Sequence, residues 1–184
     1  MIPKILIDKK LRKLRLFEYF VIKLAEWKDE ITPNSKSRFT KLQLHKLLFL
    51  SAASNDNIEK HLMFDIFDNF YALQYGPVEM DIYRAMSDVG QFSILNFNNR
   101  DCIIEKGDYI TSEISKDDKE IIDSAICSLR RRNQNYIIMS GFQLVNITHG
   151  WTVWQVSMEL ANLLGNKMER MSTSDIINSK SKTF

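Results

Sequence analysis

Hydrophobic residues recur at three- and four-residue spacing over several stretches, which is the pattern of helices that bury one face. Residues 11–28 form the first such stretch. A second begins after Thr40, its expected N-cap, and is so rich in leucine that little of its circumference is polar. This second stretch is therefore the expected central helix. At least two of the following side chains are expected to be fully buried: Leu47, Leu48 and Phe49.

The same spacing predicts further helices toward the C-terminus. Ser115 is expected to cap a helix that ends in the arginine run 130–132, where cations complement the helix dipole. Ser140 is expected to cap a short helix ending near His149. A further amphipathic segment follows, and Ser174 is expected to cap a last short helix.

Two stretches lack the regular three- and four-residue spacing of the predicted helices. Apolar residues on both sides of the turn-forming run 98–101 predict a small antiparallel β-hairpin within residues 92–110. Residues 64–73 are aromatic and partly alternating, so they stay ambiguous between strand and helix. Pro77 has a fixed φ that suits the first turn of a helix, and a helix is expected from there to Ser87.

These elements predict a mainly α fold of the α+β class, a compact helical domain with one small antiparallel hairpin. The chain has 184 residues and is 45% hydrophobic, which suits a single domain with a real core. We expect an N-terminal helix and extension over 1–39 packed on the domain, the domain itself over 40–178, and a polar tail over 179–184. The expected assembly is a monomer or a weak homodimer.

Composition excludes several classes of function. A net charge of +2 does not demand a nucleic-acid partner, and the basic runs at 9–15 and 130–132 are more typical of solvated faces and helix ends. No apolar run approaches the roughly 20 residues of a membrane span, and no signal-peptide core precedes a cleavage site. Cys102 and Cys127 fit neither a metal-ligand nor a disulfide pattern. The protein is expected to be cytoplasmic, without a membrane partner.

The sequence contains few residue patterns that are typical of a catalytic or metal site. His45 and His61 have no acid, cysteine or second histidine at metal-ligand spacing. His149 falls at a helix C-terminus, where the dipole would stabilise an imidazolium; a partner-contacting or catalytic role for it stays open. The sequence contains no nucleophile elbow, no Walker-type loop and no dinucleotide fingerprint. We therefore expect no enzyme, no catalytic residue, no metal and no cofactor.

Three segments nevertheless occur in an informative order. They are the leucine-rich basic helix 41–50, the turn 74–78 with Ile82-Tyr83 after it, and the run 144–154 that contains Thr148-His149. In this order and separation they resemble the Panacea, or SocA-like, domain of bacterial and phage antitoxins, with the likeness extending over about 40–177. The chain departs from the family pattern at Val153, where the family usually has proline.

The resemblance implies an antitoxin-like protein-binding domain of a toxin–antitoxin system, of bacterial, phage or prophage origin, with a connection to phage defence. Such a domain neutralises its cognate toxin by direct stoichiometric binding. The alternatives are a proteolytic adaptor that delivers the toxin to a protease, and a nucleic-acid-binding regulator, for which no helix-turn-helix is evident. A small hydrolase built on His149 is the least favoured interpretation.

Large amphipathic side chains near these segments are the candidate partner contacts, although a core position is the more common role for each. Trp151 is the best candidate because residues 150–152 have the composition of a loop. The candidate partner-binding residues are Tyr75, Val78, Tyr83, His149, Trp151 and Trp154.

Overall fold

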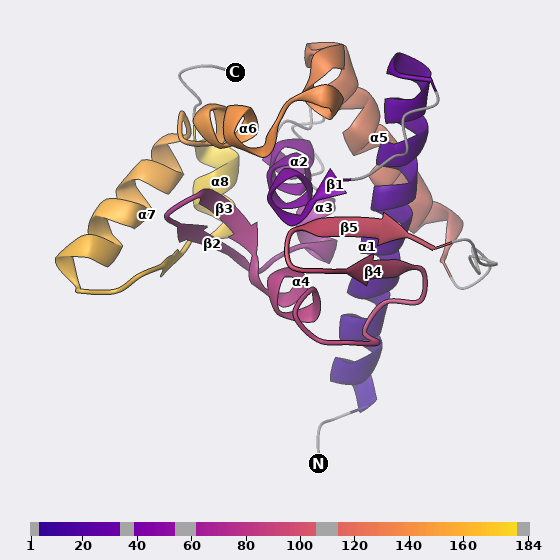
Figure 1. Ribbon diagram of the computed structural model, residues 1–184. Helices are drawn as coiled ribbons and strands as arrows, with labels where there is room; N and C mark the ends of the chain where they lie inside the picture. The colour runs from indigo at the N-terminus through magenta and orange to yellow at the C-terminus, as the bar shows by residue number, and fades with distance from the viewer. Residues whose placement is uncertain (1–3, 34–38, 54–61, 106–113, 180–184) are drawn as a thin grey trace.

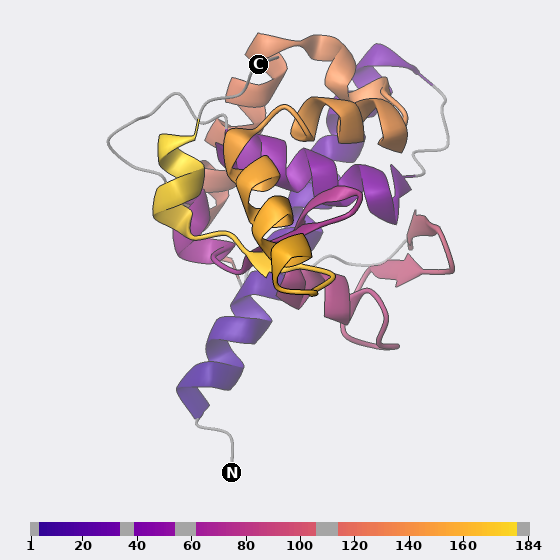
Figure 2. The same cartoon turned by 90° about the vertical axis from the view of Figure 1, so that its left-hand side faces the viewer.

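The computed structural model describes residues 4–33, 39–53, 62–105 and 114–179. The N-terminal helix α1 (Lys4–Ile31) extends beyond the predicted 11–28 at both ends. Phe17, Phe20 and Leu24 are fully buried at the spacing expected of an amphipathic helix. The first turns of α1 project from the body of the molecule, as Figure 2 shows.

Helix α2 (Lys41–Ala53) runs through the middle of the fold (Figure 1) and follows directly on the short strand β1 (Phe39–Thr40). Thr40 caps it as predicted, since the Thr40 hydroxyl accepts a hydrogen bond from the Gln43 amide at 3.1 Å. The Gln43 side chain in turn accepts from the Thr40 amide at 2.8 Å. The prediction of a buried central helix is confirmed, because the fully buried side chains include Leu47, Leu48 and Phe49.

The predicted hairpin is present as β4 (Leu95–Phe97) and β5 (Asp101–Ile104), which pair antiparallel. Strand β1 adds to β5, so the order of this first sheet is β1-β5-β4. Asn98 shapes the turn by accepting a hydrogen bond from the Asp101 amide at 2.8 Å. The end of the predicted range, 106–110, lies outside the described residues.

A second three-stranded sheet was not expected. The ambiguous stretch 64–73 contains both elements, helix α3 (Met63–Ile66) and strand β2 (Phe70–Leu73). Strand β2 pairs antiparallel with β3 (Gly76–Glu79) on one side and with β6 (Glu169–Arg170) on the other. The predicted mainly α fold of the α+β class is confirmed, and the expected hairpin is accompanied by this second small sheet.

Pro77 lies inside β3, so the expectation that it begins a helix is wrong. The proline is tolerated there because β3 is an edge strand of its sheet, where one backbone donor fewer does not interrupt pairing. Helix α4 (Met80–Ala85) begins three residues later. Its N-cap is Glu79, whose carboxylate accepts a hydrogen bond from the Ile82 amide at 2.9 Å.

The C-terminal helices are α5 (Lys116–Arg132), the 3₁₀ helix η2 (Gln134–Ile138), α6 (Gly141–Thr148), α7 (Thr152–Leu163) and α8 (Thr173–Asn178). Ser115 and Ser140 cap α5 and α6 as predicted. Helix α8 is capped by Ser172 rather than Ser174, because it is the Ser172 hydroxyl that accepts from the amide three residues on, in Asp175. Among the described residues, every helix is too short or too polar to span a bilayer.

Candidate functional site

The three informative segments meet around the side chain of Lys46. This lysine points from α2 into the core and is fully buried. Its amine donates a hydrogen bond to the backbone carbonyl of Pro77 at 2.7 Å. No carboxylate pairs with it among the described residues, and burial lowers its pKa well below the ordinary value. The amine therefore holds strand β3 against helix α2.

Gly76 allows the close approach of these elements. It follows the turn that joins β2 to β3 and has φ +91°, in the left-handed region that favours glycine. A Cβ at this position would lie 2.7 Å from the Thr148 hydroxyl and 3.0 Å from the Lys46 amine. That hydroxyl is itself held by the carbonyl of Val145 at 3.0 Å. Segments far apart in the sequence are thus fitted together at one glycine.

His149 and Trp154 extend this packing. His149 is the C-cap of α6, as predicted, and its ring stacks on the Trp154 indole with centroids 3.7 Å apart and planes at 9°. The indole N–H donates to the carbonyl of Leu73 at 3.0 Å. Burial and the charge of Lys46 lower the pKa of His149, against a backbone hydrogen bond with Gln74 that raises it. The lowered pKa argues against the stabilised imidazolium that the helix dipole led us to expect, and the stacked ring packs on Trp154.

Trp151 is not an exposed loop residue. Only 3% of it is accessible, and its ring meets that of Phe49 edge-on, with centroids 5.4 Å apart. The loop interpretation of residues 150–152 fails because Trp151 is the N-cap of α7 and its large apolar ring fills the core beside α2. Val78 is buried as well. Neither side chain offers the exposed anchor that the sequence interpretation required.

Both candidate tyrosines do reach the surface. Tyr75, at the tip of the β2–β3 hairpin, is 54% exposed, and its ring packs edge-on against Phe142 with centroids 6.2 Å apart. Phe142 is 65% exposed and was not singled out from the sequence. Its position in the sequence could have indicated this exposure, because helical spacing places Phe142 away from the face of α6 that buries Leu144 and Thr148. Tyr83 is also exposed, and its ring lies 5.7 Å from that of His45.

A pocket of about 490 Å³ opens beside these tyrosines. One face of α2 forms one wall, and Tyr75 and Tyr83 lie on the other walls. The residues of α2 that line it share one side of the helix: Lys41, Leu42, His45 and Lys46. The pocket therefore lies beside an aromatic rim formed by Tyr75 and Phe142, of which Tyr75 also lines the pocket.

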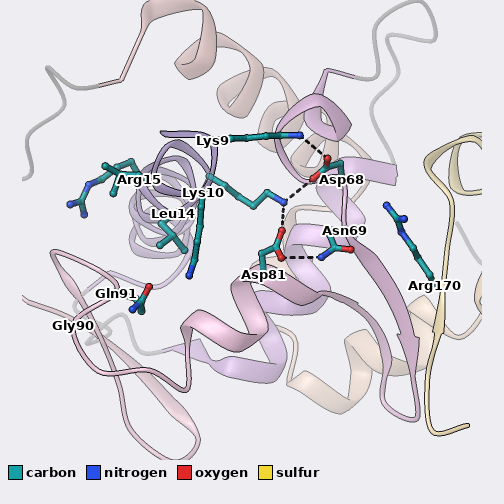
Figure 3. A pocket seen from close by; sticks show the side chains of 12 residues that line it. Lys9, Lys10, Leu14, Arg15, Asp68, Asn69, Asp81, Gly90, Gln91 and Arg170 are labelled. Atoms are coloured by element: carbon teal, nitrogen blue, oxygen red, sulfur yellow. Dashed lines mark hydrogen bonds and ion pairs between the residues drawn. The ribbon is translucent and has the colours of Figure 1, made fainter. Parts of the chain in front are cut away.

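A second, larger pocket of about 840 Å³ lies along α1 (Figure 3). In its lining, the amine of Lys13 contacts the carboxylates of Asp68 at 2.8 Å and Asp81 at 2.6 Å, and it also contacts the buried Glu79 at 2.7 Å. These carboxylates are close enough together to offer ligands to a metal ion. The amine of Lys13 already lies among them and offsets part of their negative charge. Burial disfavours its charged form, but the charge of Glu79 and the hydrogen bonds outweigh burial and raise the pKa of Lys13.

The basic run of α1 therefore has a structural role at its centre rather than forming only a solvated face. Lys13 is almost inaccessible, and Arg12 pairs with Asp118 of α5 at 3.0 Å. Arg15 pairs with the buried Glu18 at 2.7 Å. The contacts of Arg12 and Lys13 fix α1 to the rest of the molecule.

Comparison with known proteins gives one positive result. The family model described as Antitoxin SocA-like, Panacea domain matches residues 44–155. That range contains the buried lysine of α2, the glycine of the hairpin and the threonine of α6 that meet at the site. No curated protein and no solved structure matches the chain.

Proposed function

The chain belongs to the SocA-like, Panacea domain family of antitoxins, and we propose on this premise that it neutralises a toxin by binding it in a stoichiometric complex. In this account the protein turns over no substrate. The toxin is the product of a neighbouring gene, and the pair is of bacterial, phage or prophage origin.

The exposed pair Tyr75–Phe142 is the observation that supports a docking surface most directly. Large aromatic rings supply most of the binding energy in many interfaces, provided that their backbone is already ordered. Both rings are more than half exposed, while the backbone beneath Tyr75 is fixed by Gly76 and by the Lys46–Pro77 hydrogen bond. The pair thus combines accessible apolar area with little conformational freedom to lose on binding.

The residues beneath the rim favour a supporting role over a nucleophilic one. The Thr148 hydroxyl donates to Val145, and the Lys46 amine donates to Pro77. A nucleophile needs a base within hydrogen-bond reach and an open path to the substrate, whereas Lys46 and Thr148 are both fully buried. Their hydrogen bonds serve the packing of β3 and α6.

The outer face of α7 is the competing location for an interface. Its exposed apolar residues recur at helical spacing, and they are Val156, Leu160, Leu163 and Leu164. An experiment on the proposed function therefore has to compare both surfaces.

We would express the toxin encoded beside this gene in bacteria and measure growth rescue by variants of the present chain. The double variant Tyr75→Ala/Phe142→Ala is expected to lose rescue while keeping the wild-type circular dichroism spectrum and thermal midpoint. Leu11→Ser is the matched control, because Leu11 is also an exposed apolar residue but lies on α1. It should rescue fully.

Full rescue by the double variant would contradict the assignment of the rim. Loss of rescue only in Leu160→Ser/Leu163→Ser would place the interface on α7 instead. Rescue that depended on a cellular protease would point to adaptor action in place of stoichiometric neutralisation.

A further inference from the structure

The pocket beside the aromatic rim has an unbalanced set of charges. Three lysines line it, and no aspartate or glutamate does so among the described residues. The lysines come from separate places: Lys41 and Lys46 from α2, and Lys167 from the segment that precedes β6. None of the three forms an ion pair within the described part of the chain. The pocket therefore lacks the anion that would balance it.

A second buried lysine, Lys13, shows the contrast. Lys13 is as inaccessible as Lys46 to within a few per cent, yet its amine contacts three carboxylates. A buried cation is ordinarily matched in this way, because an unmatched charge out of water is costly. Among the described residues, the amine of Lys46 has the carbonyl of Pro77 as its hydrogen-bond partner, and burial lowers its pKa. Within the described part of the chain, Lys46 on the pocket side of α2 is thus a buried lysine without a carboxylate partner, unlike Lys13.

His45 is a second, independent sign of a missing ligand. It is only 4% exposed, it lines the pocket, and its Nδ1 has no hydrogen-bond partner among the described residues. A buried polar nitrogen without a partner costs on the order of 1–3 kcal/mol. Burial and the charges of Lys46 and Lys41 lower the pKa of His45 to about 3. An acceptor or anion entering the pocket would satisfy this ring and relieve both effects.

We propose that this pocket receives the carboxylate of an aspartate or glutamate side chain of the toxin. The inference rests on the proposed function and gives the chemistry of one contact within it. The carboxylate would accept hydrogen bonds from His45 and from the amines of Lys41 and Lys167. Apolar residues beside that acid would pack on Tyr75 and Phe142. A protein carboxylate fits better than a free anion because the rim continues the pocket onto an aromatic surface that only a larger partner covers.

The test uses a phage-displayed library of random twelve-residue peptides, selected on the wild-type protein. Binding of the selected peptides is then measured by fluorescence anisotropy at low and high salt. We expect the peptides to share an aspartate or glutamate, and its replacement by asparagine or glutamine should weaken binding at least about tenfold. Binding should also weaken as salt rises.

Protein variants locate the contact. Lys167 is exposed, so the variant Lys167→Gln leaves the core undisturbed. The variant Lys41→Gln removes the amine of a partly buried lysine. Each is expected to weaken peptide binding by up to about fivefold, as for an accessible ion pair. Lys10→Gln is the matched control, since Lys10 is an exposed lysine that lines the other pocket. It should leave binding unchanged.

The proposal is overturned if no peptide is enriched, if the enriched peptides lack an acid, or if both lysine variants bind as the wild type does. Tight binding of ATP or inorganic phosphate to the same lysines would also overturn it, in favour of a small-anion site. These outcomes are distinct from failure of the proposed function. If the wild-type chain gives no growth rescue, the antitoxin role fails; if rescue holds in the lysine variants, only the carboxylate contact fails.

Discussion

At the scale of single residues, Gly76 carries two constraints at once. Its φ of +91° disfavours any side chain, and its missing Cβ leaves the space that Thr148 and Lys46 occupy. Gly165 shares only the first constraint, with φ +70° and, among the described residues, no atom within 4 Å of the place that a Cβ would take. Comparing the two glycines separates backbone strain from close packing.

We expect Gly76→Ala to lower the free energy of unfolding by roughly 2–5 kcal/mol, the sum of left-handed strain and overpacking. Gly165→Ala should cost only the first part, roughly 1–2 kcal/mol. Urea unfolding of both variants measures the difference. Equal losses in the two would mean that α2, β3 and α6 do not meet tightly at Gly76.

His45 gives a pH dependence whose sign follows from its burial. Its pKa is about 3 in the folded protein and about 6.5 in an unfolded chain. Between these values the unfolded state binds a proton that the folded state does not. Stability is therefore lost as pH falls from about 6.5 toward 3, by roughly 1.4 kcal/mol per pH unit from this group.

The variant His45→Gln is expected to show a shallower loss of stability between about pH 6.5 and about pH 5, a window above the carboxylate titrations. In the wild-type protein the ring resonances of His45, followed by NMR, should not titrate in that window. A midpoint near the ordinary histidine value of about 6.5 would show that the ring is solvated and that the pocket is not as described.

At the scale of elements, ion pairs decide how α1 is held. Its hydrophobic spacing is enough to predict the helix from the sequence, and the buried face is the expected one. The sequence could not show which lysine of its basic run turns inward, because the carboxylates around Lys13 lie 55 and more positions further along the chain. Such long-range partners leave no trace in local periodicity.

Lys13→Met is expected to destabilise the protein by about 3–5 kcal/mol, because it leaves the buried Glu79 without its counter-charge. The matched control is Lys10→Met, which replaces an exposed lysine of the same helix. Thermal and denaturant unfolding of the two variants tests this expectation. A loss no larger than that of the control would show that the network does not anchor α1.

The strands are harder to predict than the helices for a physical reason. Helix caps such as Thr40, Ser115 and Ser140 act on amides three residues away, so the sequence reveals them. The β2–β3 hairpin has strands of four residues each, and β6 joins it from a distant part of the chain. From its neighbours in the sequence, Pro77 is assigned to the start of a helix. A strand tolerates proline at an edge, and the sequence does not show that β3 is an edge strand.

At the scale of the whole molecule, the order of three segments indicated the family, and the family match confirms it. The sequence did not show why the segments belong together. The structure gives the reason, which is one packing centre around Lys46, Gly76 and Thr148. Of the aromatic candidates, Tyr75 and Tyr83 are exposed and Trp151 is buried, because its ring packs against Phe49 of α2.

Stoichiometric neutralisation can be tested by titrating the purified toxin of the neighbouring gene with this protein. Toxin activity would be measured at a fixed toxin concentration, well above the dissociation constant, as the amount of this protein rises. We expect activity to fall linearly and to reach zero at a fixed molar ratio near equimolar. Complete loss of activity at far below equimolar amounts would contradict the account and indicate an enzyme.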